Sequence, residues 1–285
     1  MNTSSERVDS LMRQSDHIYS RIDRMVDGQK RSHRIVKLGI NAVALELKIG
    51  TIETAGQHYQ TILSNELNDV PARAAFKPYP QYDDLDALAH RYGTVERATL
   101  ETDGSFESDA RHAVHLSALA VPYAQEYYPH LNIAKVVIYC LIHDIIEAYT
   151  GDVPTLGISD ANLALKHEAE NAALHLLARD YGVKWPEFVR IIQDYEALAD
   201  AEARYVKTFD KLDPSFTHYT SRGTQFIHAF GYTNKNDLLQ TGLENTARIQ
   251  VYGSEFPGLL DDRWELFKRV ADHTEWPATD IAFSR

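Results

Sequence analysis

The most apolar part of the sequence contains three groups that ionise. Residues 139–155 read YCLIHDIIEAYTGDVPT, and His143, Asp144 and Glu147 interrupt the apolar run. A buried carboxylate without a partner is costly, and a second one nearby adds to the cost. A divalent cation removes this cost, because it supplies positive charge and takes carboxylate and imidazole lone pairs as ligands. The stretch therefore favours a metal-binding element in the core.

The hydrophobic pattern predicts a chain of helices. One helix is expected over residues 133–149, with positions 143, 144 and 147 on one face. Strand-like alternation is scarce, so the fold class that we predict is all-α. The other helices that we expect in this part of the chain cover residues 85–92, 109–126, 160–181, 185–199, 201–212, 235–252 and 257–273.

Residues 1–70 carry helical patterns of their own, and a proline-rich connector begins at Pro71. The apolar stripe of the first pattern, over residues 5–26, fits either packing on its own domain or an oligomerisation element. We predict an N-terminal helical extension over 1–70, a main domain over 83–275 and a frayed tail over 276–285. We also expect a homo-oligomer, a dimer or larger.

Composition narrows the classes of partner. The net charge of −12 argues against a surface for duplex nucleic acid, which needs clustered lysine and arginine. The negative net charge is still compatible with a small anionic substrate, because a metal ion can reverse the electrostatic field inside a cleft. The chain has a single cysteine, an N-terminus without a signal-peptide pattern and no apolar run long enough to span a bilayer. We therefore expect a cytoplasmic protein without a membrane partner.

Further candidate ligands lie on other predicted elements. His112 and His115 are one turn apart in the helix that begins at residue 109, and Asp210 lies in the segment RYVKTFDKLD. Asp152 follows the central helix in a Thr-Gly-Asp turn that Pro154 closes. A His-Asp pair alone is expected about once by chance in a chain of this composition, so these further residues are what give the pair its weight.

This combination resembles the HD-domain superfamily of metal-dependent phosphohydrolases. Within it, the chain looks most similar to the 5′-deoxynucleotidases and to related enzymes that hydrolyse deoxynucleoside triphosphates. The family pattern is a first His, a later His-Asp pair and a distant Asp, and here it is met by His112, His143–Asp144 and Asp210. The segments GDVP and VKTFD also match the nucleotidase branch, and the resemblance covers residues 85–275. The chain departs from the family pattern in two places. The first His follows Arg111 instead of Glu, and the segment ETDGSF adds residues before this His.

The resemblance implies an HD-domain helical bundle with one divalent cation, which could be Mn, Co, Mg, Zn or Fe. Its ligands would be His112, His143, Asp144 and Asp210, with His115 as the alternative if the register is shifted. Without the family pattern, a lone histidine on a helix would more simply be a structural residue.

The resemblance also implies roles beside the metal. Glu147 would orient or deprotonate the attacking water, and Asp152 would protonate the leaving nucleoside oxygen or hold the water. Arg91 and Lys207 are candidate phosphate contacts. A simpler interpretation is that Glu147 forms a salt bridge with a neighbouring Lys or Arg and that Asp152 only forms a turn. Arg91 and Lys207 would then be solvated surface cations.

Three functions follow from these expectations. The first is an enzyme that removes phosphate from deoxynucleoside 5′-monophosphates. Its partner would be its substrate, a small-molecule deoxynucleotide. The second is release of triphosphate from deoxynucleoside triphosphates at the same site. The third is a non-catalytic regulator of the same fold that binds metal or nucleotide, against which Glu147 and Asp152 count, because a binding module needs no water-activating carboxylate.

Overall fold

The computed structural model describes residues 3, 5–10, 13, 83–101, 105–228 and 230–277. The chain divides into two units, one made of Met1–Ser15 and Asp84–Arg285 and the other of Asp16–Asp83. The predicted extension over 1–70 therefore lies almost wholly outside the described residues, and so does most of the predicted tail over 276–285. The oligomer and the cytoplasmic location stay predictions.

The described part of the chain is built mainly of helices, which confirms the all-α prediction. None of these helices combines the length and the apolar character that crossing a membrane requires. In chain order the helices are α3 (Asp83–Gly93), α4 (Asp109–Tyr127), α5 (Ile133–Ile142), α6 (Glu147–Thr150), α7 (Asp160–Tyr181), α8 (Pro186–Glu196), α9 (Ala201–Asp210), α10 (Pro214–Thr220), α11 (Thr224–His228), α12 (Lys235–Gly253) and α13 (Pro257–His273).

Local sequence signals set most of the helix starts. Proline occupies the first turn of α8, α10 and α13, where its missing N–H costs nothing. In five other helices a polar side chain accepts a hydrogen bond from an N–H group of the first turn. These capping residues are Ser108 for α4, Asn132 for α5, Ser159 for α7, Asp200 for α9 and Asn234 for α12.

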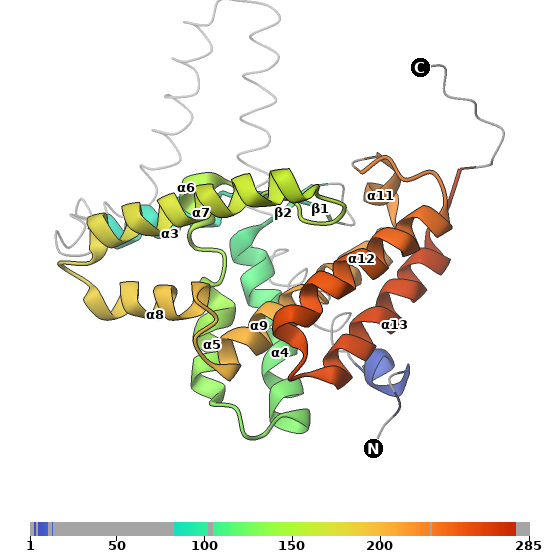
Figure 1. Cartoon of the computed structure of the whole chain (residues 1–285), viewed down its shortest axis with the longest axis horizontal. Helices are drawn as coiled ribbons and strands as arrows, with labels where there is room; N and C mark the ends of the chain where they lie inside the picture. The colour runs from blue at the N-terminus through green and yellow to red at the C-terminus, as the bar shows by residue number, and fades with distance from the viewer. Residues whose placement is uncertain are drawn as a thin grey trace, which may run out of the picture. The chain divides into compact units, whose positions relative to one another are not determined.

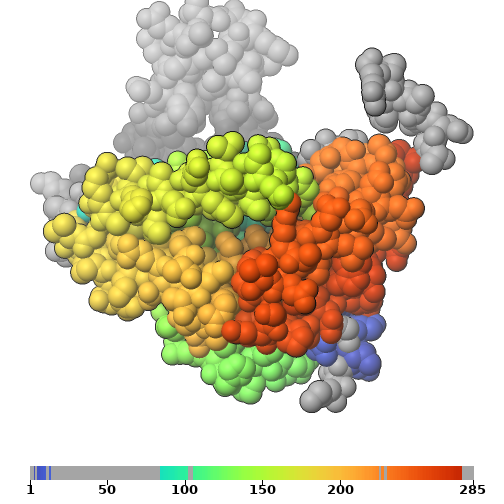
Figure 2. Space-filling model, viewed as in Figure 1, coloured from blue at the N-terminus to red at the C-terminus, as the bar shows by residue number. Residues whose placement is uncertain are grey.

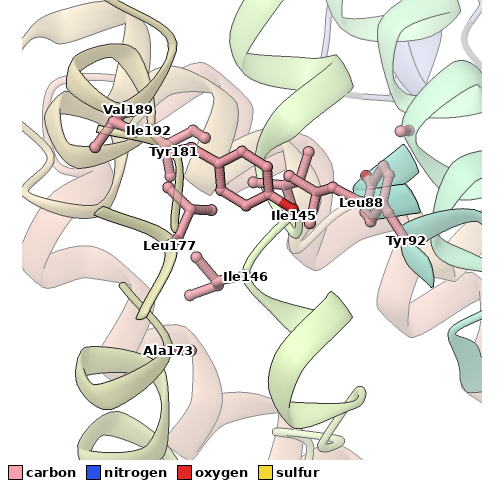
Figure 3. Packing of buried hydrophobic residues seen from close by; sticks show 10 residues of the cluster. Leu88, Tyr92, Ile145, Ile146, Ala173, Leu177, Tyr181, Val189 and Ile192 are labelled. Atoms are coloured by element: carbon pink, nitrogen blue, oxygen red, sulfur yellow. The ribbon is translucent and has the colours of Figure 1, made fainter. Parts of the chain in front are cut away.

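Helices α4, α5 and α9 pack together at the centre of the domain (Figure 1). Helix α7 runs across one end of this group, with α8 packed beside it, and α12 and α13 pack together on another side and contact α9. Ten buried residues from α3, α4, the turn after α5, α7 and α8 pack together, and Tyr181, Leu177 and Ile145 lie among them in Figure 3. The central helices are thus held from several sides, which fixes the side chains that they carry.

The predicted continuous helix over 133–149 is wrong. Helix α5 ends at Ile142, residues 143–146 form tight turns, and α6 begins at Glu147. The N–H of Glu147 donates to the carbonyl of Asp144 at 2.8 Å, an i to i+3 bond. One cause lies in His143, whose ring donates from Nδ1 to the Cys140 carbonyl at 2.9 Å and so competes with the helical backbone.

A short antiparallel hairpin, which the sequence did not predict, precedes the first candidate ligand. Strand β1 (Glu96–Leu100) pairs with β2 (Phe106–Ser108), and α4 starts directly after β2. Of the additional residues ETDGSF, Glu101 follows β1 directly and Phe106 begins β2, while residues 102–104 lie outside the described part of the chain. The hairpin brings β1 against α10 and carries Arg97 toward the candidate site.

Candidate metal centre

Four side chains from three parts of the chain converge in the centre of the domain. Each of them offers one ligand atom, and these atoms all lie within 4.8 Å of one another. All four residues are buried, so their charges are withheld from water. Two imidazoles and two carboxylates are a donor set that suits a divalent transition-metal ion. The four are His112 on α4, His143 and Asp144 after α5, and Asp210 at the end of α9.

The ring of His143 is oriented for ligation. Its Nδ1 donates to the Cys140 carbonyl, which leaves the Nε2 lone pair of a neutral ring on the opposite side. Nε2 lies 2.8 Å from Asp144 Oδ2 and 3.6 Å from Asp210 Oδ1. Nε2 has no hydrogen-bond partner within the described chain. A nitrogen that binds a metal ion must be free in this way.

A fifth buried residue, Asp213, contacts the Nδ1 side of the His112 ring. Its Oδ2 lies 3.0 Å from His112 Nδ1, and its Oδ1 lies 2.9 Å from His115 Nδ1. His112 Nε2 then faces Asp210 Oδ1 at 2.9 Å. A carboxylate behind a ligating imidazole is the arrangement that fixes its tautomer in metal sites. His112 therefore joins the cluster, whereas His115, the alternative in the sequence, contacts Asp213.

The guanidinium of Arg97 also lies at the cluster. Its Nη1 is 2.6 Å from Asp144 Oδ2 and 3.5 Å from Asp109 Oδ1, and its Nε is 3.5 Å from Glu107 Oε2. Asp109, Asp144 and Glu147 form a second group of buried carboxylates with atoms within 4.8 Å of one another. Arg97 supplies positive charge to both groups and holds Asp144 in place.

Glu147 lies beside the cluster with one oxygen engaged. Its Oε1 accepts from Lys166 Nζ at 3.2 Å, while Oε2 is buried and has no hydrogen-bond partner in the described chain. Burial and the charges of Asp144 and Asp152 raise the pKa of Glu147 to about 9, although Lys166 lowers it. A carboxyl group with a raised pKa next to a cation site is a good candidate for proton transfer.

The cluster opens into a cavity of about 410 Å³, large enough for a small-molecule ligand. The surface is hollowed under α7, between α7 and α12 (Figure 2), and both helices line the cavity. Asp152 and Lys207 line it together with Glu147. Asp152 follows Gly151, whose φ of 74° is readily adopted only by glycine, and its Oδ2 accepts from the Ala98 N–H at 3.3 Å.

The structure does not bring Arg91 into the cavity. Its guanidinium lies over the ring of Tyr149, 4.8 Å from the centroid, and Nη2 donates to the Tyr181 hydroxyl at 3.4 Å. Arg97, six residues later, lines the cavity in its place. Sequence reasoning missed Arg97 because the hairpin was not expected. It also missed Asp213, for which the spacing of three residues from Asp210 was the available signal.

The pKa values of the acidic groups at the site predict an unusual pH dependence of stability. Burial raises the pKa of Glu147 to about 9 and that of Asp109 to about 7, so the folded state favours their protonated forms. Stability from these groups is present at low pH and is lost as pH rises through the folded-state values. We expect the melting temperature of chelator-treated protein to fall between about pH 5 and about pH 9. A melting temperature that rises across this window, measured by circular dichroism, would contradict the assignment.

Comparison with known proteins identifies the family. The family model described as HD domain matches residues 89–245, more than half of the chain. The chain belongs to the HD domain family. HD domains bind divalent metal ions, and the buried His/Asp cluster lies within the matched region. Family membership and the cluster together support a metal-dependent phosphohydrolase. A search of curated proteins finds no match.

Three solved structures are similar to this HD domain. A predicted metal-dependent phosphohydrolase from Magnetospirillum magnetotacticum is 25% identical, with a TM-score of 0.49, and the match covers 69% of this chain and 97% of that protein. A conserved hypothetical protein from Pyrococcus furiosus is 23% identical, with a TM-score of 0.40 and coverage of 62% and 97%. The PH0347 protein from Pyrococcus horikoshii is 19% identical, with a TM-score of 0.45 and coverage of 64% and 99%.

Proposed function

We propose that this HD domain is a metal-dependent phosphohydrolase that removes phosphate from deoxynucleoside 5′-monophosphates. The observation that carries the proposal is the pairing of the four-ligand cluster with Glu147 on the wall of one cavity. A protein that only binds metal needs no carboxylate that activates water, and Glu147 Oε2 is buried without a hydrogen-bond partner in the described chain.

The proposed metal ligands are His112, His143, Asp144 and Asp210, with Arg97 and Asp213 holding two of them in place. When bound, a divalent cation would polarise a phosphoryl oxygen and lower the pKa of a water molecule. The fit rests on the donor set and on the Nδ1 contacts, which turn both imidazole Nε2 atoms toward the carboxylates.

Other cavity residues would carry the proton transfers. With a cation bound, its positive charge would lower the pKa of Glu147 and leave the carboxylate ionised. Glu147 then takes a proton from the attacking water, the water oxygen bonds to phosphorus, and the bond from phosphorus to the 5′ oxygen breaks. Asp152 gives a proton to that leaving oxygen. Lys207 binds the phosphate as a point charge, since no carboxylate of the described chain lies within ion-pair distance of its ammonium.

The nucleotide part of the proposal has two supports. The segments GDVP and VKTFD match the nucleotidase branch, and in the structure both contribute residues to the cavity lining. Aromatic side chains lie on the same cavity and offer faces on which a base can stack. These aromatic residues are Phe230, Tyr252 and Phe267.

Product analysis tests the function directly. Purified protein loaded with Mn²⁺ or Co²⁺ is incubated with each deoxynucleoside monophosphate and triphosphate. Inorganic phosphate and nucleoside from the monophosphate support the proposal, whereas intact triphosphate from the triphosphate supports the alternative hydrolase. If metal binds and no nucleotide is turned over, the protein is a non-catalytic binder and the proposal is wrong.

Replacing Asp213 with asparagine is expected to lower metal affinity by about 10- to 100-fold, as loss of an outer-shell partner typically does. The asparagine side chain would fill the same space but could no longer offer two anionic oxygens to His112 and His115. Calorimetric titration with Mn²⁺ measures the effect, and a melting curve checks that the variant folds. An unchanged dissociation constant in a folded variant would remove Asp213 from the site.

A further inference from the structure

The cationic side chains on the cavity wall are not equally neutralised. Four of them have a carboxylate within ion-pair distance. Two others, Lys207 and Arg263, have none in the described part of the chain. The neutralised pairs are Arg97 with Asp144 at 2.6 Å, Lys166 with Glu170 at 2.8 Å, Lys211 with Asp210 at 2.7 Å and Arg248 with Asp160 at 2.7 Å.

Arg263 on α13 is buried with only neutral partners. The residue is 2% exposed, its Nε donates to the Lys211 carbonyl at 3.1 Å, and its Nη1 donates to Thr246 Oγ1 at 2.7 Å. Nη2 has no acceptor among the described residues. Burial lowers the pKa of Arg263 to about 10. A buried charge without a counterion is costly, so this position is expected to gain from a bound anion.

Two lysines lie on the same wall. Lys207 and Lys211 are one helical turn apart at the end of α9, and both line the cavity. Like charges at this spacing repel each other. The contact between Arg263 Nε and the Lys211 carbonyl joins α13 to the end of α9, so Arg263 lies on the same part of the wall as these lysines.

The three cations Lys207, Lys211 and Arg263 lie next to the metal centre, but Arg263 comes from a part of the chain outside the family match. Lys211 pairs with Asp210, one of the proposed ligands, so the basic wall begins beside the cluster. Arg263 lies on α13, beyond residues 89–245 that match the HD domain family. Helix α13 therefore contributes a charge that the matched region does not contain.

We propose that Arg263, with Lys207 and Lys211 beside it, forms a second anion subsite that binds a phosphoryl group next to the metal centre. The group is either a second phosphate on the nucleotide substrate or free inorganic phosphate. Arg263 donates from its planar fork, and the lysines act as point charges. The assignment of the phosphoryl group to a nucleotide substrate rests on the proposed function. The binding of phosphate at the subsite does not, because it requires no hydrolysis.

Calorimetric titration of metal-free protein with inorganic phosphate tests the subsite. Arg263→Gln is expected to weaken phosphate binding by about tenfold to a hundredfold, the loss expected for one or two hydrogen bonds to a charged group. Arg248→Gln is the matched control, because Arg248 lines the same cavity but is neutralised by Asp160, and it should bind phosphate like the wild type. An Arg263→Gln dissociation constant equal to that of the wild type overturns the proposal.

A second variant guards against misfolding. If a melting curve shows that Arg263→Gln does not fold, Arg263→Lys replaces it, since lysine keeps a cation at this position but loses the planar fork of donors. It should also weaken phosphate binding about tenfold. Unchanged binding in a folded Arg263→Lys protein likewise overturns the subsite.

Steady-state kinetics then separate the two sources of phosphate. The kcat/KM of a nucleoside 5′-monophosphate is compared with that of the same nucleoside carrying a second phosphoryl group. A preference for the second substrate that disappears in Arg263→Gln assigns the subsite to the substrate. Equal values in wild type and variant, together with Arg263-dependent phosphate binding, assign it to the free ion.

Discussion

Replacement of Glu147 by glutamine is expected to lower kcat by about 10²- to 10⁴-fold, the usual contribution of a general base. Glutamine keeps the size of the side chain and a hydrogen-bond acceptor for Lys166, but it cannot accept a proton from water. Metal binding should be retained, because Glu147 is not among the four residues of the His/Asp cluster. Phosphate release under saturating nucleotide measures the loss, and calorimetry with Mn²⁺ measures the metal.

Glu170 offers a matched control for this experiment. It also pairs with Lys166, at 2.8 Å, and lines the same cavity, but it does not belong to either cluster of candidate ligands. Glu170→Gln should therefore retain activity within a few-fold. If Glu147→Gln is as active as the wild type, the water-activating role belongs to another group and the proposed mechanism is wrong.

Replacement of Asp144 by alanine is expected to remove metal binding and, with it, hydrolysis. Asp144 Oδ2 is the oxygen that both His143 Nε2 and Arg97 Nη1 approach, at 2.8 and 2.6 Å. Loss of this carboxylate removes one of two negative charges in the set of four ligands, so affinity should fall by more than the roughly 100-fold reached when an outer-shell partner is lost.

The metal content of the purified variant and its titration with Mn²⁺ measure this effect. Asp152→Asn is the control for metal binding, since Asp152 lines the cavity but lies outside the His/Asp cluster. One bound metal per chain at wild-type affinity in Asp144→Ala would show that the four residues are not the metal site.

Much of the site could be predicted from the sequence because its signals are local. His143, Asp144 and Glu147 stand out by their charge in an apolar run, and the structure turns all three toward the cavity although the helix that was expected to carry them breaks at Ile142. His112 and Asp210 were predicted through the family pattern, and they meet at 2.9 Å across 98 residues.

Other members of the site have no comparable local signal. Arg97 reaches Asp144 only because a short hairpin places β1 beside the core, while Arg91, the expected cation, packs on Tyr149. Arg263 reaches the cavity from α13, and its charge is distinctive only once burial and the absence of a nearby carboxylate are known for the described chain.

The sequence by itself determined the helical class, most helix boundaries and the residue types able to bind a metal, since hydrophobic period, capping and charge act over a few residues. Only the tertiary structure decided which of the cations face the cavity and which carboxylate, Asp213, supports His112. Such choices depend on the packing of α4, α9 and α13 against one another, and contacts across a hundred residues leave no trace in local periodicity.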